Sequence, residues 1–403
     1  AIFRTKKIVS AFLIFSLIFG SLEFIRGSIL SGFPWNLIVY SLSNQLEILS
    51  LISIIGTYGL NLFCISMFTS PAIFFLKDSR KDIAVPIFFI IMVIIFYFYG
   101  SFYKEKFNNT ISQTYEYKVR VIGSNVSLSR FYSNSNPVLI IQDLIEVSNP
   151  NPDEKTIFVW PEGILPDIYQ KELKDYSWLF SENFNENHLL VMGINSQSIN
   201  SGLKNYFNTL SVYDHKLNLL NSYNKIRLVP FGEYLPFEDI LKLFGLKSLT
   251  NNYQSYSSGD KRETIEIKRK NFSLKFLPLI CYEIIYTGSL FKNSDFDVII
   301  NISEDGWFGK SIGPYQHFNH SIFRAIESGK YVVRSANNGI AAIINPLGVV
   351  EQVIDFDQIG YIDFKENRKI QPTIFSKYGN KIFVLLILLY IFLIFSFNRI
   401  KNE

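Results

Sequence analysis

The middle of the chain contains the stretch Leu277-Pro278-Leu279-Ile280-Cys281-Tyr282-Glu283, in which an apolar run ends at reactive side chains. Two further apolar runs end in the same way: Phe158–Pro161 leads into Glu162, and Val298–Ser303 leads into Glu304 and Asp305. Short apolar runs bounded by turn residues are typical of buried strands. In open α/β sheets the site forms outside the carboxyl ends of the strands. We therefore predict that these three strand ends converge on one pocket.

From Tyr117 onward, short β-rich runs alternate with helical stretches, and this alternation predicts an α/β domain. The predicted strands are Tyr117–Ile122, Thr156–Trp160, Leu189–Ile194, Asn208–Tyr213, Ser273–Ile280, Val298–Ile302, Tyr331–Ser335 and Ile340–Ile344. The predicted helices are Pro137–Glu146, Asp167–Leu179 and Gln316–Ser328.

The two ends of the 403-residue chain are much more apolar than its middle. Four segments are candidate membrane spans, and they are roughly Ile8–Ile25, Ile54–Leu76, Val85–Tyr103 and Ile382–Phe397. A span needs about 20 apolar residues, so the last segment is short and the third is marginal. These runs have no polar face to turn toward water, which disfavours buried helices of a soluble protein. Glu23 and Arg26 lie at the end of the first apolar stretch, where a signal peptide has small cleavage-site residues, so we predict a retained helix.

Basic residues predict the orientation of these spans, because Lys and Arg are enriched in cytoplasmic loops. Three basic clusters flank the spans: Arg4, Lys6 and Lys7; Lys77, Arg80 and Lys81; Arg399 and Lys401. If all three are cytoplasmic, the loop near Gly32–Trp35 and the segment from about Lys104 to Asn380 face the extracytoplasmic side. The net charge of +4 is too weak to indicate nucleic-acid binding.

Only two cysteines occur, Cys64 and Cys281, which excludes a disulfide scaffold. The sequence also lacks the Cys/His clusters that are typical of zinc sites. His317 and His320 have a spacing compatible with metal binding, but no third ligand is evident, so packing is favoured and no metal is predicted. An unpaired cysteine in an oxidising compartment needs a reason. Cys281 is either a buried inert residue or a nucleophile.

The surroundings of Cys281 favour a nucleophile. A thiol attacks carbonyl groups as the thiolate, so it needs a base. Glu162 at the end of its strand is the candidate base, since reduced solvation favours the protonated form of a carboxylate. The oxyanion formed in acyl transfer needs a cation or aimed N–H groups. Lys225 and the backbone N–H of Tyr282 are the candidates for this role.

These residues carry a resemblance to a known family. The segments Trp160–Glu162, Lys225–Glu233 and Ile280–Glu283 resemble the Glu–Lys–Cys triad of the nitrilase, or carbon–nitrogen hydrolase, superfamily. More narrowly, the chain resembles the apolipoprotein N-acyltransferases. The segments that carry this narrower resemblance are Gly32–Trp35, Lys225–Pro236, Ile280–Glu283, Asp305–Gly309, Ser311–Phe318 and Arg334–Gly339. The chain departs from the family pattern at Glu304, where Asn is frequent, and at Phe131, where Trp is frequent.

The resemblance implies a nitrilase-like αββα sandwich inserted between transmembrane helices. The expected division is a membrane domain at 1–104, an extracytoplasmic catalytic domain at 117–366, and a linker with a last helix at 367–403. The family has eight spans, so we expect the remaining ones before residue 1. The implied location is the bacterial inner membrane, with a multi-pass topology and the catalytic domain on the periplasmic side.

The implied reaction moves an acyl chain from a phospholipid, through a thioester on Cys281, to the N-terminal amine of the diacylglyceryl-cysteine of an apolipoprotein. The resemblance assigns catalysis to Glu162, Lys225 and Cys281, and supporting roles to Glu233, Tyr282 and Glu283. It places substrate contacts at Phe131, Trp307, Phe308 and His317, although core packing competes with this role for the aromatic residues. No cofactor is implied, and a monomer suffices.

Two other functions stay open on the sequence. A membrane-tethered amidase would have the same triad, with water as the acceptor. A non-catalytic protein would bind lipid or lipoproteins through an inactive domain. The membrane spans argue against the first function, and the complete triad argues against the second.

Overall fold

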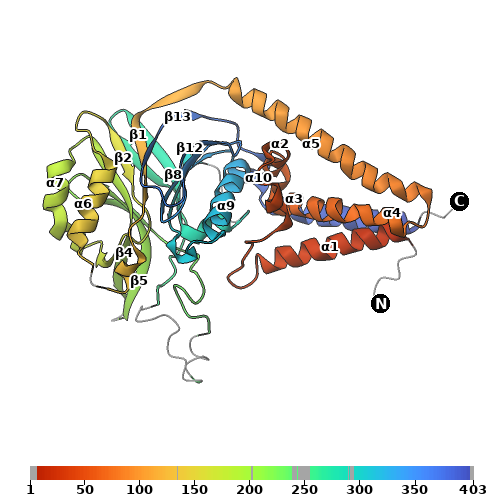
Figure 1. Ribbon diagram of the computed structural model, residues 1–403, viewed down its shortest axis with the longest axis horizontal. Coiled ribbons are helices and arrows are strands. Elements are labelled where there is room, and N and C mark those ends of the chain that lie inside the picture. Colours follow the sequence, from red (N-terminus) through yellow and green to blue (C-terminus); the bar gives the residue numbers. More distant parts are fainter. Residues whose placement is uncertain are drawn as a thin grey trace.

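The computed structural model describes residues 7–133, 135–200, 203–237, 243, 255–288, 290 and 295–399. The molecule has a helical part and a sheet part that lie end to end (Figure 1). The long helices of the helical part are α1 (Ile8–Arg26), α3 (Ile52–Thr69), α5 (Ala84–Asn108) and α11 (Lys381–Arg399). Its short helices are η1 (Ile38–Leu42), α2 (Leu46–Leu49), η2 (Ser70–Ala72), α4 (Ile73–Leu76), η3 (Arg80–Ile83) and α10 (Ile374–Tyr378).

Four helical segments within the described residues are long and apolar enough to cross a membrane. They coincide with the four predicted spans, which are therefore confirmed as helices. The third and fourth are longer than predicted, since they reach Arg80–Asn108 and Lys381–Arg399. Large apolar side chains on their outer faces are exposed, for example 67% for Phe98 and 66% for Phe392. Such exposure fits contact with lipid, because a water-soluble protein rarely exposes a contiguous apolar face of this size.

A kink in α3 joins the helical part to the sheet part. Gly56 has φ 72° and ψ 172°, a conformation that only glycine adopts readily. The kink frees the N–H of Thr57, and the carboxylate of Glu327 accepts a hydrogen bond from it at 2.9 Å and another from the Thr57 hydroxyl at 2.6 Å. Arg324 balances this buried carboxylate, with 2.9 Å between its Nε and Glu327 Oε2. The membrane-spanning segment is thus fixed to α9 (Gly313–Ser328) by a buried ionic contact.

The described strands form one 13-stranded network that folds into two layers. The first layer holds β1 (Ser112–Ser124), β2 (Thr156–Val159), β3 (Leu165–Tyr169), β4 (His188–Asn200), β5 (Leu203–Asp214), β6 (Leu219–Asn224) and β13 (Gly360–Arg368). The second holds β7 (Ile265–Arg269), β8 (Phe272–Ile280), β9 (Val298–Glu304), β10 (Tyr331–Asn337), β11 (Ala341–Ile344) and β12 (Val350–Ile354). The layers join where β1 pairs with β10 at Gly123 and Ser124. The central strands β1, β2 and β4 pair in parallel, as do β8, β9 and β10.

Alternating side chains build two apolar cores on the two faces of the first layer. Val159 on β2 and Val191 on β4 point into the core that also contains the second layer. Their neighbours Phe158 and Leu190 point to the opposite face, where they pack with residues of α6 (Pro137–Ser148) and α7 (Ser177–Asn183). The second layer is covered by α9, seen between the sheets and the membrane helices in Figure 1. The order of layers is helix, sheet, sheet, helix, which confirms the predicted αββα fold class.

The predicted helix at Asp167–Leu179 is wrong. Residues Leu165–Tyr169 form β3, and the following residues form the 3-10 turn η5 (Glu172–Tyr176) before α7 begins. β3 pairs with β4 in parallel, and the N–H of Gln170 donates to the carbonyl of Asn195 at 2.9 Å. Pairing to a strand distant in sequence outweighs the local preference for helix here. Five strands were not predicted, namely β3, β6, β7, β12 and β13.

We expect Gly56→Ala to destabilise the protein, because the new methyl group meets two obstacles. Its Cβ would lie 2.0 Å from Cε2 of Phe375, a buried residue of α10, and the backbone would hold a non-glycine residue at positive φ. The strained backbone alone costs about 1–3 kcal/mol. The measurement is the apparent melting temperature of the detergent-solubilised protein. Gly360→Ala is the matched control, since nothing lies within 4 Å of its Cβ position. Equal melting temperatures for the two variants would contradict this account.

Candidate active site

The predicted nucleophile stands at a sharp turn directly after β8. Cys281 has φ 50°, a left-handed conformation that is rare outside glycine, and it opens the 3-10 turn η6 (Cys281–Ile285). The side chain of Asn301, from the neighbouring β9, donates hydrogen bonds to the carbonyls of Leu279 and Cys281 at 3.2 and 3.4 Å. These contacts fix the strand end on which the thiol is carried, and Cys281 is only 8% exposed.

Glu162 and Lys225 meet in a buried cluster of charges beside this turn. Lys225 Nζ lies 3.3 Å from Glu162 Oε1 and 2.9 Å from Glu233 Oε1. The side-chain amide of Asn208 donates to the same two oxygens, at 2.6 and 2.7 Å. The second oxygen of Glu162 accepts from the backbone N–H of Glu304 at 3.0 Å. The three predicted strand ends therefore converge, since Glu162 follows β2, Glu304 ends β9 and Cys281 follows β8.

Burial and neighbouring charges shift the pKa values of Lys225 and Cys281. Burial opposes the positive charge of Lys225, but the nearby carboxylates of Glu162 and Glu233 outweigh burial and raise its pKa well above the usual value. Burial, reinforced by the negative charge of Glu162, raises the pKa of the Cys281 thiol, and Lys225 counters this only in part. The resting thiol therefore carries its proton at neutral pH. An attack by sulfur then requires a neighbouring group that accepts this proton.

Glu283 joins the nucleophile turn to the lysine segment. Its Oε1 accepts from Arg262 at 2.5 Å, from the Tyr223 hydroxyl at 2.7 Å and from the N–H groups of Ile226 and Arg227 at 3.1 Å. Its Oε2 accepts from the N–H of Ile280, at 3.0 Å. A buried carboxylate with this many donors is held rigidly in place. Glu283 thus holds the strand end of Cys281 against the segment that carries Lys225.

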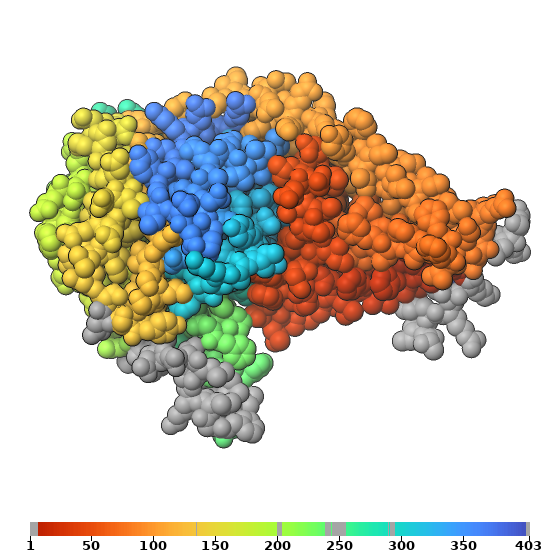
Figure 2. All heavy atoms as spheres, viewed as in Figure 1, coloured from red at the N-terminus to blue at the C-terminus, as the bar shows by residue number. Residues whose placement is uncertain are grey.

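Tyr282 contacts the loop between α1 and η1, which was predicted to face the extracytoplasmic side. The ring of Phe33 stacks on Tyr282 with centroids 6.4 Å apart. Tyr282 is hydrogen-bonded to the hydroxyl of Tyr286, which donates to the carbonyl of Ser31 at 2.6 Å. The residue after the nucleophile therefore connects the site directly with the helical part. The close contact between the two parts is visible in Figure 2, where red-orange atoms of the helical part abut blue and cyan atoms of the C-terminal half of the chain.

His317 is fully buried and lies behind this loop. Its Nδ1 is 2.8 Å from Asp305 Oδ1, and Arg334 lies 2.7 Å from the other oxygen of Asp305. Burial lowers the pKa of His317, although Asp305 opposes this shift. The ring of Trp35 stacks on the imidazole, with centroids 5.6 Å apart. Within the described residues, no group of three or more His, Cys, Asp or Glu side chains is arranged to hold a metal ion.

The predicted substrate-contact aromatics lie in two 3-10 turns, η4 (Leu128–Phe131) and η7 (Gly306–Phe308). Phe131, at the end of η4, packs against Trp307 of η7, with centroids 4.9 Å apart. Trp307 is 52% exposed, whereas Phe308 packs against Trp35 and His317. Glu304, the departure from the family pattern, forms a fully buried ion pair with Arg130 next to Phe131. Sequence reasoning missed Arg130, and it also missed Asn208 and Arg262.

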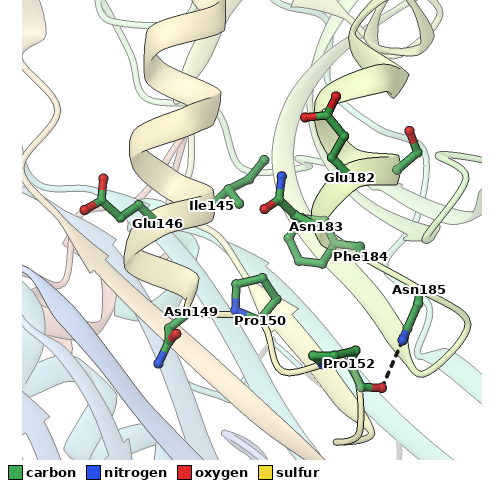
Figure 3. Close-up of a pocket in the computed structure, with 10 residues that line it drawn as sticks. Ile145, Glu146, Asn149, Pro150, Pro152, Glu182, Asn183, Phe184 and Asn185 are labelled. Atoms are coloured by element: carbon green, nitrogen blue, oxygen red, sulfur yellow. Dashed lines mark hydrogen bonds between the residues drawn. The ribbon is translucent and has the colours of Figure 1, made fainter.

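A pocket of about 510 Å³ lies elsewhere, between the C-terminal ends of α6 and α7 (Figure 3). It is lined by Ile145, Glu146, Asn149, Pro150, Pro152, Ser181, Glu182, Asn183, Phe184 and Asn185. None of the predicted site residues takes part in it. It is therefore separate from the cluster around Cys281.

Comparisons with known proteins identify the family of the chain. The carbon–nitrogen hydrolase family model matches residues 160–363, and the model of the apolipoprotein N-acyltransferase N-terminal domain matches residues 1–70. A curated relative from Rickettsia prowazekii named apolipoprotein N-acyltransferase is 34% identical over 97% of this chain and 77% of its own. A relative of the same name from Rickettsia bellii is 36% identical over 94% of this chain and 74% of its own. A CN-hydrolase superfamily structure from Xanthomonas campestris has a TM-score of 0.42 at 15% identity, over 63% of this chain and 91% of its own.

We expect Asn208→Asp to slow alkylation of Cys281 by iodoacetamide at pH 8 by about tenfold or more, because a third carboxylate beside Glu162 and Glu233 raises the thiol pKa further. Asn208→Ala removes the two donated hydrogen bonds without adding a charge and should lie between the parent and Asn208→Asp. Asn205→Asp, three residues earlier on β5, is the matched control, since its side chain contacts Ser257. Alkylation at the parent rate in Asn208→Asp would show that Asn208 does not set the charge balance of the site.

Proposed function

Because the chain belongs to the apolipoprotein N-acyltransferase family, we propose that Glu162, Lys225 and Cys281 are its catalytic triad. The protein is a bacterial membrane enzyme that transfers an acyl group in lipoprotein biosynthesis. The observation that carries the triad proposal is the buried cluster in which Lys225 pairs with Glu162 and both act electrostatically on the Cys281 thiol. We further propose that the donor is a phospholipid, that the acceptor is a diacylglyceryl-modified apolipoprotein, and that a monomer suffices.

In the first half-reaction, Glu162 takes the proton of the Cys281 thiol as sulfur attacks an ester carbonyl of the phospholipid. The oxyanion of the tetrahedral intermediate is stabilised by the Lys225 ammonium and by the backbone N–H of Tyr282. The carbon–oxygen bond then breaks, and the leaving alkoxide takes the proton from Glu162. The products are a thioester on Cys281 and a lysophospholipid, with no net change in protons.

In the second half-reaction, the neutral amine of the diacylglyceryl-cysteine attacks the thioester. Glu162 takes a proton from the attacking nitrogen, and the carbon–sulfur bond breaks. The thiolate recovers this proton from Glu162, so the thiol is regenerated and an amide is released. An amine that arrives as ammonium releases one further proton to solvent. Glu233 and Glu283 support both steps by fixing the positions of Lys225 and the nucleophile turn.

The positions of the proposed substrate contacts fit two lipid substrates. Trp307 and Phe131 form an apolar wall next to Glu162, where an acyl chain can lie. Tyr282 meets the interhelical loop, and Phe308 and His317 support that loop through Trp35. We propose the domain division 1–104, 117–366 and 367–403, in which the first and last parts hold the catalytic part at the bilayer.

We also propose a multi-pass topology with the sheet part outside the cytoplasm, on the periplasmic side. Lys77, Arg80 and Lys81 lie beside α4, at the tip of the helical part away from the sheets, and α1 begins and α11 ends at the same tip (Figure 1). Basic residues gathered at one end of a set of spans favour a cytoplasmic position for that end. Arg4, Lys6 and Lys401, which also entered this prediction, lie outside the described residues.

The triad proposal predicts a covalent adduct. Incubation of the detergent-solubilised protein with a phospholipid should add the mass of one acyl chain, and hydroxylamine should remove it. Cys281→Ala should show no adduct, and Glu162→Gln should form it about 10²–10⁴-fold more slowly, the usual contribution of a general base. Cys64→Ala is the matched control for the thiol and should react as the parent does. An adduct that persists in Cys281→Ala would contradict the assignment of the nucleophile.

The topology proposal predicts opposite labelling of two introduced thiols. In a Cys64→Ala/Cys281→Ala background, Ser181→Cys on α7 should react with a membrane-impermeant maleimide in intact spheroplasts. Ser79→Cys, between the second and third spans, should react only after the membrane is permeabilised. The reverse pattern would place the catalytic part in the cytoplasm.

A further inference from the structure

The segment that carries Lys225 also carries Arg227, which has no carboxylate partner among the residues that the structure describes. The guanidinium of Arg227 makes no ion pair with any carboxylate of the described residues and lies over the ring of Tyr286, 5.1 Å from its centroid. Its side chain is half-buried. The backbone N–H of Arg227 donates to Glu283 at 3.1 Å, which fixes where the side chain starts. Among the described residues, Arg227 is therefore a positioned cation that pairs with no carboxylate.

The other two cations near Cys281, Lys225 and Arg262, already form ion pairs with carboxylates. Lys225 lies between Glu162 and Glu233, and Arg262 is paired with Glu283 at 2.5 Å. These three carboxylates outnumber the two cations. An anion that approaches this cluster is therefore repelled unless a further positive charge offsets the excess. Arg227 is the cation placed to do so.

Arg227 also lies at the level where a lipid headgroup belongs. Tyr286, under its guanidinium, donates to the carbonyl of Ser31 in the loop between α1 and η1. That loop exposes Leu30 to 81%, and the lysine segment exposes Phe231 to 55%. Exposed apolar side chains on segments next to a cation are typical of a membrane interface, where the apolar groups enter the bilayer and the charge stays at the headgroups.

We propose that Arg227 binds the phosphodiester of the phospholipid that donates the acyl chain. The inference rests on the proposed function and names the headgroup subsite of that same site. In a phospholipid, only the glycerol backbone separates the phosphodiester from the ester that Cys281 attacks. Arg227 is two residues from Lys225, the group that stabilises the oxyanion of that ester. A guanidinium forms two parallel hydrogen bonds to phosphate oxygens, which orients the lipid as well as binding it.

The test measures thioester formation by the full-length protein in neutral detergent micelles, with the mole fraction of phospholipid varied. Arg227→Gln and Arg227→Met should raise the half-saturating mole fraction about 10–100-fold, the usual effect of a lost hydrogen bond to a charged group. The maximal rate should stay within about twofold of the parent, since uniform binding is lost and the chemistry is not. Arg227→Lys should recover part of the affinity, because it keeps the charge without the planar fork.

Arg26→Gln is the matched control. Arg26 ends α1 at the same interface and is paired with Glu23 at 3.1 Å, so its loss should leave the half-saturating mole fraction unchanged. Inorganic phosphate separates a lipid site from a general anion site. Inhibition by millimolar phosphate that disappears in Arg227→Gln, together with an unchanged half-saturating mole fraction of phospholipid in that variant, would assign Arg227 to free anions and overturn the lipid subsite.

The remaining outcomes are also decisive. A half-saturating mole fraction equal to that of the parent in both Arg227→Gln and Arg227→Met would overturn the proposal, since the arginine would then only pack on Tyr286. A lower maximal rate at unchanged half-saturation would overturn it too, because Arg227 would then act on the nucleophile turn through Glu283. If the parent forms no thioester with any phospholipid, the proposed function fails, and this result is distinct from a failure of the subsite.

Discussion

The buried ammonium of Lys225 is the constraint on which the rest of the site depends. A charge that is 1% exposed is stable only when opposite charges and hydrogen bonds surround it, since an unpaired buried charge costs several kcal/mol. Glu162 and Glu233 supply those charges, and Asn208 keeps the two carboxylates apart by donating to both. The four side chains come from the end of β2, from β5 and from the segment after β6. The strand order β5-β4-β2 is what brings them together.

Buried contacts also connect the sheet part to the helices of the membrane part. Glu327 accepts a hydrogen bond from the N–H of Thr57, which the kink at Gly56 leaves free. A carboxylate of α9 therefore binds the backbone of α3, one of the membrane-spanning helices. On the other side, Tyr286 holds the carbonyl of Ser31, and Trp35 packs on His317. These contacts, two hydrogen-bonded and one a ring stack, join the helical part to the sheet part, and a soluble hydrolase lacks the helices that they hold. They favour an acceptor and a donor that both arrive from the bilayer, and they disfavour water as the acceptor.

Sequence patterns indicated the residues of the proposed triad and the α/β class of the domain because both depend on local signals. An apolar run that ends in Glu, Lys or Cys is visible in a window of a few residues, and the four spans are visible in windows of about 20. Asn208 and Arg262 gave no such signal. The local sequence around a single polar residue in or near a strand does not show whether its side chain faces solvent or a buried carboxylate. The helix predicted at Asp167–Leu179 failed for a related reason. β3 exists only because β4 lies beside it, and that pairing is set by the whole sheet.

Glu304 shows how a departure from the family pattern can be accommodated by charge. A second carboxylate next to Glu162 raises the negative potential at the base, and burial raises the pKa of Glu304. Arg130 neutralises the charge of Glu304 in a buried ion pair, and its Nε donates to the carbonyl of Gly163 at 3.0 Å. The side-chain amide of Asn337 also donates to Glu304, at 2.7 Å. The ion pair therefore connects Gly163, which follows Glu162, to the end of β9. There the backbone N–H of Glu304 donates to Glu162. The ion pair adds no net charge, so Glu162 keeps its neighbours and the wall formed by Phe131 and Trp307 keeps its position.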